Sequence, residues 1–292
     1  MPKNGKPLFL TFIFCALFYF ASPRVHAQEL HGKDFNLVHW SYAASNGTGV
    51  YWIGENREVY VLRITPMFTH RFKFEKVFKD REILLEFRFP LTFGVHNFEF
   101  SELLSGGFPD SIEQISFTPG LEFMLPVSSR WNLRIFGHFG YGSAISYEEG
   151  SAWIYWGGIT SRFVFPIKHI YLGLINGYRT AGYTPNHGDS GDLSHLMNGL
   201  EFKIPIGRIG SSENPFFLKP HVMNFWYYDH VEFTAIQKKK RVSLASEWEI
   251  GLAIGKSQRM KIWLFYIDRL GVGYRFGPKS NGIRIYFSSY FR

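Results

Sequence analysis

The segment GYTPNHGDSGDLSHLMNG (182–199) brings together the residue types that an activated nucleophile needs. A serine hydroxyl becomes a nucleophile when a histidine base lies within hydrogen-bond reach and an acid orients that base. His187, Asp189 and Ser190 could supply these three roles, and His195 is a second candidate base. The segment is also rich in the glycine, aspartate and serine residues of ordinary turns, so a solvated loop is the simpler interpretation.

Metal, cofactor and nucleic-acid chemistry have little support in the sequence. Zinc sites use cysteines and histidines at short, fixed spacings, but the histidines after residue 27 form no i, i+4 pair and the one cysteine, Cys15, lies in an apolar run. The formal net charge of +8 at pH 7 would suit a nucleic acid, but charge alone is a weak signal. We therefore expect no metal, no cofactor and no nucleic-acid partner.

A short basic run, QKKKR (237–241), lies in a segment that we expect to form a loop. Lysine and arginine side chains bind phosphate groups, so this run could contact the phosphates of lipopolysaccharide. A solvated loop tip is the simpler alternative. Both interpretations place the run at the surface of the protein.

Residues 1–27 match an export signal. Two lysines precede an apolar run at 8–20, and Val25 and Ala27 occupy the positions that a signal peptidase reads. The apolar run is too short to span a bilayer as a helix, although an uncleaved anchor remains an alternative. We therefore predict export, with cleavage leaving one domain over 28–292.

The aromatic content indicates the class of fold. Phenylalanine, tyrosine and tryptophan make up 19% of the chain, with 31 phenylalanines. A water-soluble core does not need so many large aromatic residues, whereas a transmembrane barrel carries an outward apolar band between two aromatic girdles. After residue 27 no apolar run is long enough for a spanning helix, so a membrane crossing there would use strands.

Alternation of apolar and polar residues recurs from about residue 58 to the end of the chain. A period of two places successive side chains on opposite faces of a strand. In the segment 84–93 one face is apolar and carries Leu85, Phe87, Phe89, Leu91 and Phe93. In the segment 242–254 the apolar face carries Val242, Leu244, Trp248, Ile250, Leu252 and Ile254. We interpret both segments as half-apolar strands.

The connection lengths predict the number of strands. Short connections are expected at 126–129, 166–168 and 255–259, a medium one at 206–214, and long polar ones at 94–111, 143–152, 182–195 and 230–241. Outer-membrane barrels alternate short periplasmic turns with longer outside loops in this way. The pattern predicts about twelve strands, over 35–43, 58–68, 82–93, 112–125, 130–142, 153–165, 169–181, 196–205, 215–229, 242–254, 260–276 and 283–291. Within them, Pro90 and Pro119 mark bulges or strand ends.

Charged residues alternate with the apolar ones along these strands. Charges are costly in hydrocarbon, so we expect them to face the lumen of the barrel. The residues assigned to the lumen are Glu86, Arg88, Arg134, Arg162, Arg179, Glu201, Lys203, Glu247, Glu249 and Arg275. Both signs of charge occur on the same faces, so these side chains would either cross-link the lumen shut or line a narrow pore.

The C-terminal segment GIRIYFSSYFR (282–292) alternates to the end of the chain and carries Tyr286, Phe287 and Phe291. It resembles the closing strand of Gram-negative outer-membrane β-barrels, which the barrel-assembly machinery recognises through a terminal aromatic residue. The tail 268–291 is most similar to solitary autotransporter-like barrels, and the segment 119–142 fits the same style. The resemblance implies twelve strands, no passenger domain and an outer-membrane location. The final Arg292 departs from the aromatic terminus.

These observations favour an all-β, antiparallel transmembrane barrel with a structural or transport role and no enzymatic activity. A small diffusion pore is one alternative, and a soluble β-sandwich is another. A third alternative is a lipid hydrolase at the rim, of the phospholipase or lipid A deacylase type, using Ser190 with His187 or His195. Those enzymes carry a compact His-x-Ser motif, whereas two residues separate His187 from Ser190 here and Met197 occupies the place of a serine. The expected partners are membrane lipids, lipopolysaccharide and the assembly machinery.

Overall fold

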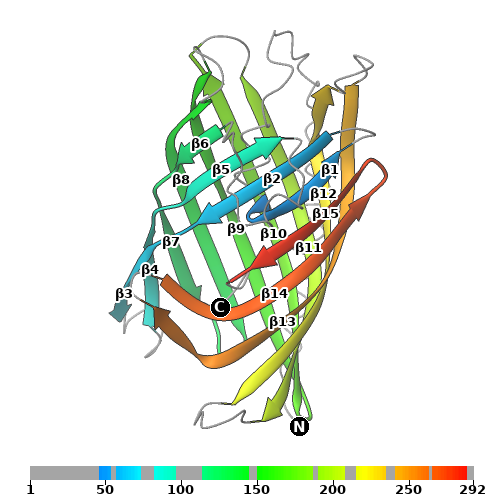
Figure 1. Cartoon of the computed structure of the whole chain (residues 1–292). Coiled ribbons are helices and arrows are strands. Elements are labelled where there is room, and N and C mark those ends of the chain that lie inside the picture. The colour runs from blue at the N-terminus through cyan, green and yellow to red at the C-terminus, as the bar shows by residue number, and fades with distance from the viewer. Residues whose placement is uncertain are drawn as a thin grey trace.

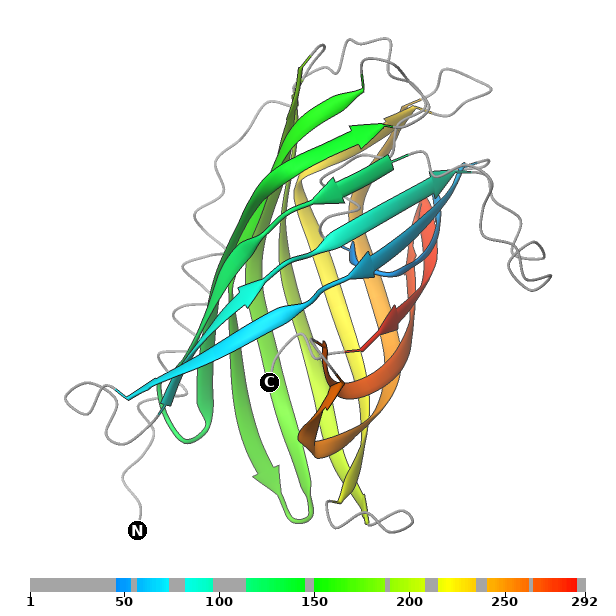
Figure 2. The same cartoon turned by 60° about the vertical axis from the view of Figure 1, so that its left-hand side comes forward.

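The computed structural model is an all-β barrel (Figures 1 and 2). It describes residues 46–53, 57–73, 82–96, 114–144, 150–186, 190–207, 215–234, 241–262 and 265–287. The strands are β1 (Gly49–Ile53), β2 (Arg57–Ile64), β3 (Met67–Lys73), β4 (Glu82–Arg88), β5 (Leu91–His96), β6 (Gln114–Phe117), β7 (Gly120–Pro126), β8 (Trp131–Ala144), β9 (Ser151–Ile167), β10 (Ile170–Pro185), β11 (Gly191–Gly207), β12 (Phe216–Thr234), β13 (Arg241–Ile262), β14 (Phe265–Gly277) and β15 (Ser280–Tyr286). Within the described ranges, no helix has the length and apolar character needed to cross a membrane.

Three prolines divide three long strands into the six short elements from β2 to β7. Pro66 lies between β2 and β3, Pro90 between β4 and β5, and Pro119 between β6 and β7. A proline has no N–H to donate, yet backbone hydrogen bonding continues across the breaks. The N–H of Phe89 donates to the Pro66 carbonyl at 3.0 Å, and that of Thr118 donates to the Pro90 carbonyl at 3.0 Å. Each divided pair therefore acts as one strand, and the barrel has twelve.

The twelve strands form a closed antiparallel ring. β1 pairs with β2 on one side and with β15 on the other, so that Gly49 lies opposite both Val61 and Arg284. The pairing of β8 with β9 completes the circuit. The twelve-stranded antiparallel barrel that alternating connections predict is thus confirmed.

The individual strands differ from the prediction near both ends of the chain. β1 occupies the position beside β2 in which the segment 35–43 was expected to form the first strand. Residues 35–43 themselves lie outside the described residues. The turn expected at 255–259 is wrong, because β13 continues through it and β14 begins only at Phe265. The last strand was expected over 283–291. It covers Ser280–Tyr286 in the structure, and 288–291 lie outside the described residues.

One predicted side-chain direction is also wrong. Leu244 was expected on the outer face together with Trp248, but it is buried inside the barrel. The register between β12 and β13 shifts at this point, because Val231 pairs with Leu244 whereas Trp226 pairs with Ser246. An irregularity of this kind moves the following residues to the opposite face.

The wall of the barrel is uneven in height. β9 to β13 have 16 to 22 residues each, whereas β1 has 5 and β15 has 7. The long strands form one tall wall, and the short strands that close the ring lie on the other side (Figure 1).

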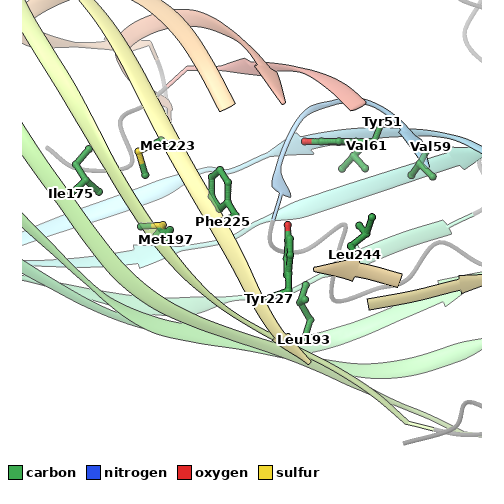
Figure 3. Close-up of a cluster of buried hydrophobic side chains, with 10 residues drawn as sticks. All are labelled: Tyr51, Val59, Val61, Ile175, Leu193, Met197, Met223, Phe225, Tyr227 and Leu244. Carbon is green, nitrogen blue, oxygen red and sulfur yellow. The ribbon is translucent and has the colours of Figure 1, made fainter. Parts of the chain in front are cut away.

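An apolar cluster crosses the interior (Figure 3). Its ten buried side chains are Tyr51, Val59, Val61, Ile175, Leu193, Met197, Met223, Phe225, Tyr227 and Leu244. The first three come from β1 and β2, and the others come from β10 to β13, on the opposite side of the ring. The cluster therefore packs one wall of the barrel against the other.

We predict that Gly140 in β8 does not tolerate alanine. A Cβ atom at this position would lie 1.9 Å from the Phe117 carbonyl oxygen and 2.6 Å from the Thr118 Cα. Both are backbone atoms close to the break at Pro119, so the strand itself would have to move. We expect Gly140→Ala to lower the free energy of unfolding by about 1–3 kcal/mol, measured by denaturant unfolding of the refolded barrel in detergent.

Gly137, in the same strand, is the matched control for this prediction. A Cβ atom there would meet no atom within 4 Å. Gly137→Ala should therefore change the free energy of unfolding by less than about 0.5 kcal/mol. Equal effects of the two substitutions would contradict the packing seen around Gly140.

Candidate functional site: the charged interior of the barrel

The barrel has apolar residues on its outer face and charged residues in its interior. Exposed large apolar side chains include Phe139, Trp153, Trp248, Ile250 and Val272. The charged residues predicted to face the lumen include seven that are buried: Glu86, Arg134, Arg162, Glu201, Glu247, Glu249 and Arg275. The remaining three, Arg88, Arg179 and Lys203, are half-buried. All of these side chains except that of Arg179 belong to three clusters, each built around a shared carboxylate.

The first cluster is centred on Glu122 of β7. Arg134 Nη2 lies 2.6 Å from one carboxylate oxygen of Glu122, and Arg88 Nε lies 2.9 Å from the other. Arg88 also lies 2.9 Å from Glu86. Three neighbouring strands, β4, β7 and β8, are thereby cross-linked from the inside.

His138 connects this cluster to the barrel backbone. Its Nδ1 lies 3.1 Å from the Thr118 carbonyl, and its Nε2 lies 3.4 Å from Glu122. The N–H of Thr118 donates a hydrogen bond to the Pro90 carbonyl. Because Pro90 has no N–H with which to bind the Thr118 carbonyl in turn, that carbonyl accepts a hydrogen bond from the imidazole instead. A carbonyl only accepts, so Nδ1 carries a proton. The ring stacks on Trp156 with centroids 3.7 Å apart, which fixes its plane.

The second cluster is centred on Glu249 of β13. Arg275 Nε and Arg284 Nη1 lie 3.2 and 2.7 Å from the same carboxylate oxygen. His221 Nε2 lies 3.2 Å from the other oxygen. Four strands, β12 to β15, thus meet at one carboxylate. The adjacent Glu247 accepts hydrogen bonds from two further side chains, the hydroxyls of Tyr227 and Ser280.

The chain preceding β1 also contributes to the second cluster. Gly47 has a φ of +83°, a backbone conformation that glycine adopts without strain. This turn directs Asn46 into the interior, where its side-chain oxygen accepts a hydrogen bond from Arg275. Tyr51 donates its hydroxyl to the Gly47 carbonyl. The segment that precedes β1 is therefore hydrogen-bonded to β14, on the other side of the pairing between β1 and β15.

The third cluster is centred on Glu201 of β11. Arg162 Nη2 lies 2.7 Å from one of its oxygens, and Arg269 Nη1 lies 2.6 Å from the other. Arg162 reaches Glu201 by lying across β10, where a Cβ atom at Gly173 would come within 3.1 Å of its Nε. A glycine at this position leaves room for the guanidinium. Arg269 reaches the same carboxylate from β14.

The arrangement is suited to holding strands together rather than to bond breaking. Each carboxylate is engaged by arginines, which do not lose their protons in proteins. No group of three or more histidine, cysteine or acidic residues within the described ranges has the geometry of a metal site. The three clusters and the apolar cluster between the walls connect strands across the interior.

The candidate rim nucleophile does not lie beside the histidine that was its second candidate base. Ser190 is exposed at the start of β11, whereas His195 is buried inside the barrel between the rings of Phe225 and Tyr227. Five residues of extended strand separate them, or about 16 Å. The other two proposed members, His187 and Asp189, lie outside the described residues, so their arrangement with Ser190 stays a prediction.

Two of the three residues predicted to form the assembly signal lie within the described chain. Tyr286 points inward and donates its hydroxyl to the Val272 carbonyl at 3.0 Å, whereas Phe287 is exposed on the outer face. Phe291 lies outside the described residues, as does most of the basic run 237–241.

The prediction of lumenal charges omitted several residues that the structure shows to be central. These residues are Glu122, His138, His221, Arg269 and Arg284. Glu122 and Arg284 follow the same period-two alternation, which is a sufficient signal for both. Arg269 follows it as well, because it lies six residues before Arg275 and on the same face of β14.

We predict that the second cluster contributes strongly to stability. Glu249→Ala would leave the buried guanidiniums of Arg275 and Arg284 without their shared carboxylate. Breaking a buried ion pair by removing one partner costs about 3–5 kcal/mol. We therefore expect a loss of that size in the free energy of unfolding, measured with denaturant in detergent.

The exposed ion pair between Glu82 and Arg71 is the control for this prediction. Their side chains are 3.4 Å apart, and the arginine is 70% exposed. Glu82→Ala should cost less than about 1 kcal/mol, because exposed pairs are screened by water. If Glu249→Ala is no more harmful than Glu82→Ala, the interior network does not stabilise the barrel.

Comparisons with known protein families and with curated proteins found no match. The barrel, the polarity of its two faces and the contacts that cross its interior are therefore the features that bear on function.

Proposed function

We propose that the protein is a β-barrel of the outer membrane, with a structural role and a closed lumen. The observation that carries this proposal is the inverted polarity of the barrel. Its large apolar side chains are exposed on the outer face, and its charges are buried in the interior. In water this arrangement would leave the apolar surface unburied, at a cost of about 25 cal/mol for each Å². In a bilayer the same surface contacts acyl chains, and the buried charges of the interior are kept away from lipid.

Aromatic residues on the outer face support the proposal. Phe139 and Trp153 stack with ring centroids 5.2 Å apart near the long-loop ends of β8 and β9, and Tyr141 packs edge-on against the same indole. Trp226 and Tyr228 stack similarly on β12. Amphipathic rings of this kind favour the interface between acyl chains and headgroups.

The closed interior favours a structural barrel over an open diffusion pore. The apolar cluster joins β1 and β2 to β10–β13 across the lumen, and water does not wet such a dry contact. The arginines on either side are held by carboxylates rather than lining a water-filled path. Of the two possibilities that mixed lumenal charges leave open, the cross-linked lumen fits these contacts better.

Two features of the sequence support an outer-membrane location. Residues 1–27 match an export signal, and the closing strand resembles the strand that the barrel-assembly machinery recognises. In β15, Ile283 and Ile285 are exposed on the outer face, as is Phe287 directly after it, which lipid contact requires. The partners in this proposal are membrane lipids, lipopolysaccharide and the assembly machinery.

We predict that the purified wild-type barrel gives no discrete channel openings in a planar bilayer. Met197 and Phe225 are cross-strand partners within the apolar cluster and are fully buried. Met197→Ala combined with Phe225→Ala should open the dry contact and produce frequent openings. Trp226→Ala, on the outer face of β12, should stay silent. Steady openings from the wild-type barrel would instead favour a pore.

We also predict that Ser190→Ala leaves lipid release unchanged. The structure does not place Ser190 beside His195, so this histidine does not activate the hydroxyl. The measurement is the release of fatty acid from phospholipid and from lipid A, by the wild-type and variant barrels in mixed micelles. A wild-type rate that Ser190→Ala abolishes would support the hydrolase alternative.

A further inference from the structure

The third charged cluster contains more positive charge than Glu201 can neutralise. The Glu201 carboxylate is shared between two guanidiniums, those of Arg162 and Arg269. Lys203, two residues further along β11, lies close enough to both arginines to be repelled by their charge. One carboxylate is therefore shared by three cations of this cluster.

Several donors in this cluster have no acceptor. Arg269 is 3% exposed, and neither its Nε nor its Nη2 has a hydrogen-bond partner within the described part of the chain. The same holds for the Nε of Arg162, which is also buried. A buried donor without an acceptor is costly, and here three such N–H groups occur on two guanidiniums that bind one carboxylate. The unused donors lie where a second anion would be favourable.

The cluster lies near one end of the barrel and can be reached from it. Lys203 is half-buried, and its Nζ lies 3.9 Å from the centre of the Phe217 ring and 5.9 Å from that of Tyr171. Tyr171 is the second residue of β10, next to the tight turn between β9 and β10, and its side chain is exposed. Lys203 and Tyr171 therefore lie between the buried arginines and the solvent at the short-turn mouth.

We propose that Arg162, Arg269 and Lys203 form a binding site for a phosphate-type oxyanion at the short-turn mouth of the barrel. The planar guanidinium matches the oxygen spacing of phosphate and binds it through two parallel hydrogen bonds. Lys203 supplies a mobile positive charge at the entrance. The phosphate group comes either from a free anion or from a lipid headgroup, because both present the same oxygens.

Binding is tested by calorimetric titration of the full barrel in a neutral detergent, at constant ionic strength. The two probes are inorganic phosphate and a short-chain phosphatidylglycerol. We expect saturable binding to the wild-type barrel, and Arg269→Gln should weaken it about tenfold, because it removes charge-assisted hydrogen bonds. Lys203→Gln, at the half-buried entrance, should weaken it about threefold.

Arg71→Gln is the matched control, because Arg71 is also ion-paired but lies on β3, outside the cluster, with a side chain that is 70% exposed. It should bind both probes as the wild-type barrel does. Binding of both probes shows that a phosphate group is sufficient, and binding of the lipid alone identifies a headgroup as the ligand. If Arg269→Gln does not fold, the result with Lys203→Gln decides.

The proposal is overturned if the wild-type barrel binds neither probe, or if Arg71→Gln weakens binding as much as the substitutions in the cluster. The titration in detergent does not depend on channel closure or on location in a membrane. Failure of this site is therefore distinguishable from failure of the proposed function.

Discussion

The shared carboxylate between two buried arginines is the interaction on which the barrel interior depends. Glu122, Glu201 and Glu249 each bind two guanidiniums that belong to different strands. An unpaired charge in such a place would be very costly, so each cluster holds its strands in one register. Removing an arginine or its carboxylate would leave the charge of the other partner buried, so each cluster is stable only when both partners are present. This constraint decides which way every neighbouring side chain must face.

The inward charges leave the outer face to apolar residues. Each strand alternates, so if Glu249 and Glu247 point into the lumen, then Trp248 and Ile250 between and beyond them must point outward. The outer surface then requires an apolar surrounding, and the interior is filled by cross-linked side chains and the apolar cluster of Figure 3. These two consequences of one pattern support the proposal of a membrane-embedded barrel with a closed lumen.

The strand number and the direction of most side chains could be predicted from the sequence, because period two and connection length are local properties. The partners of the side chains could not. Arg162 binds Glu201 across Gly173, and this contact depends on the stagger of three strands, which no local pattern encodes. Leu244 was misplaced because a shift of register between β12 and β13 reverses the alternation. The turn expected at 255–259 was misplaced because glycine and polar residues also occur inside β13.

The most direct test of the central claim is quenching of tryptophan fluorescence by lipids with brominated acyl chains. Trp153, Trp226 and Trp248 are exposed on the outer face, whereas Trp156 is buried in the interior and stacks on His138. Barrels that retain one of these tryptophans at a time would be reconstituted into vesicles. The account predicts strong quenching of Trp226 and Trp248 and little quenching of Trp156. Equal quenching at all positions, or quenching of Trp156 alone, would contradict it.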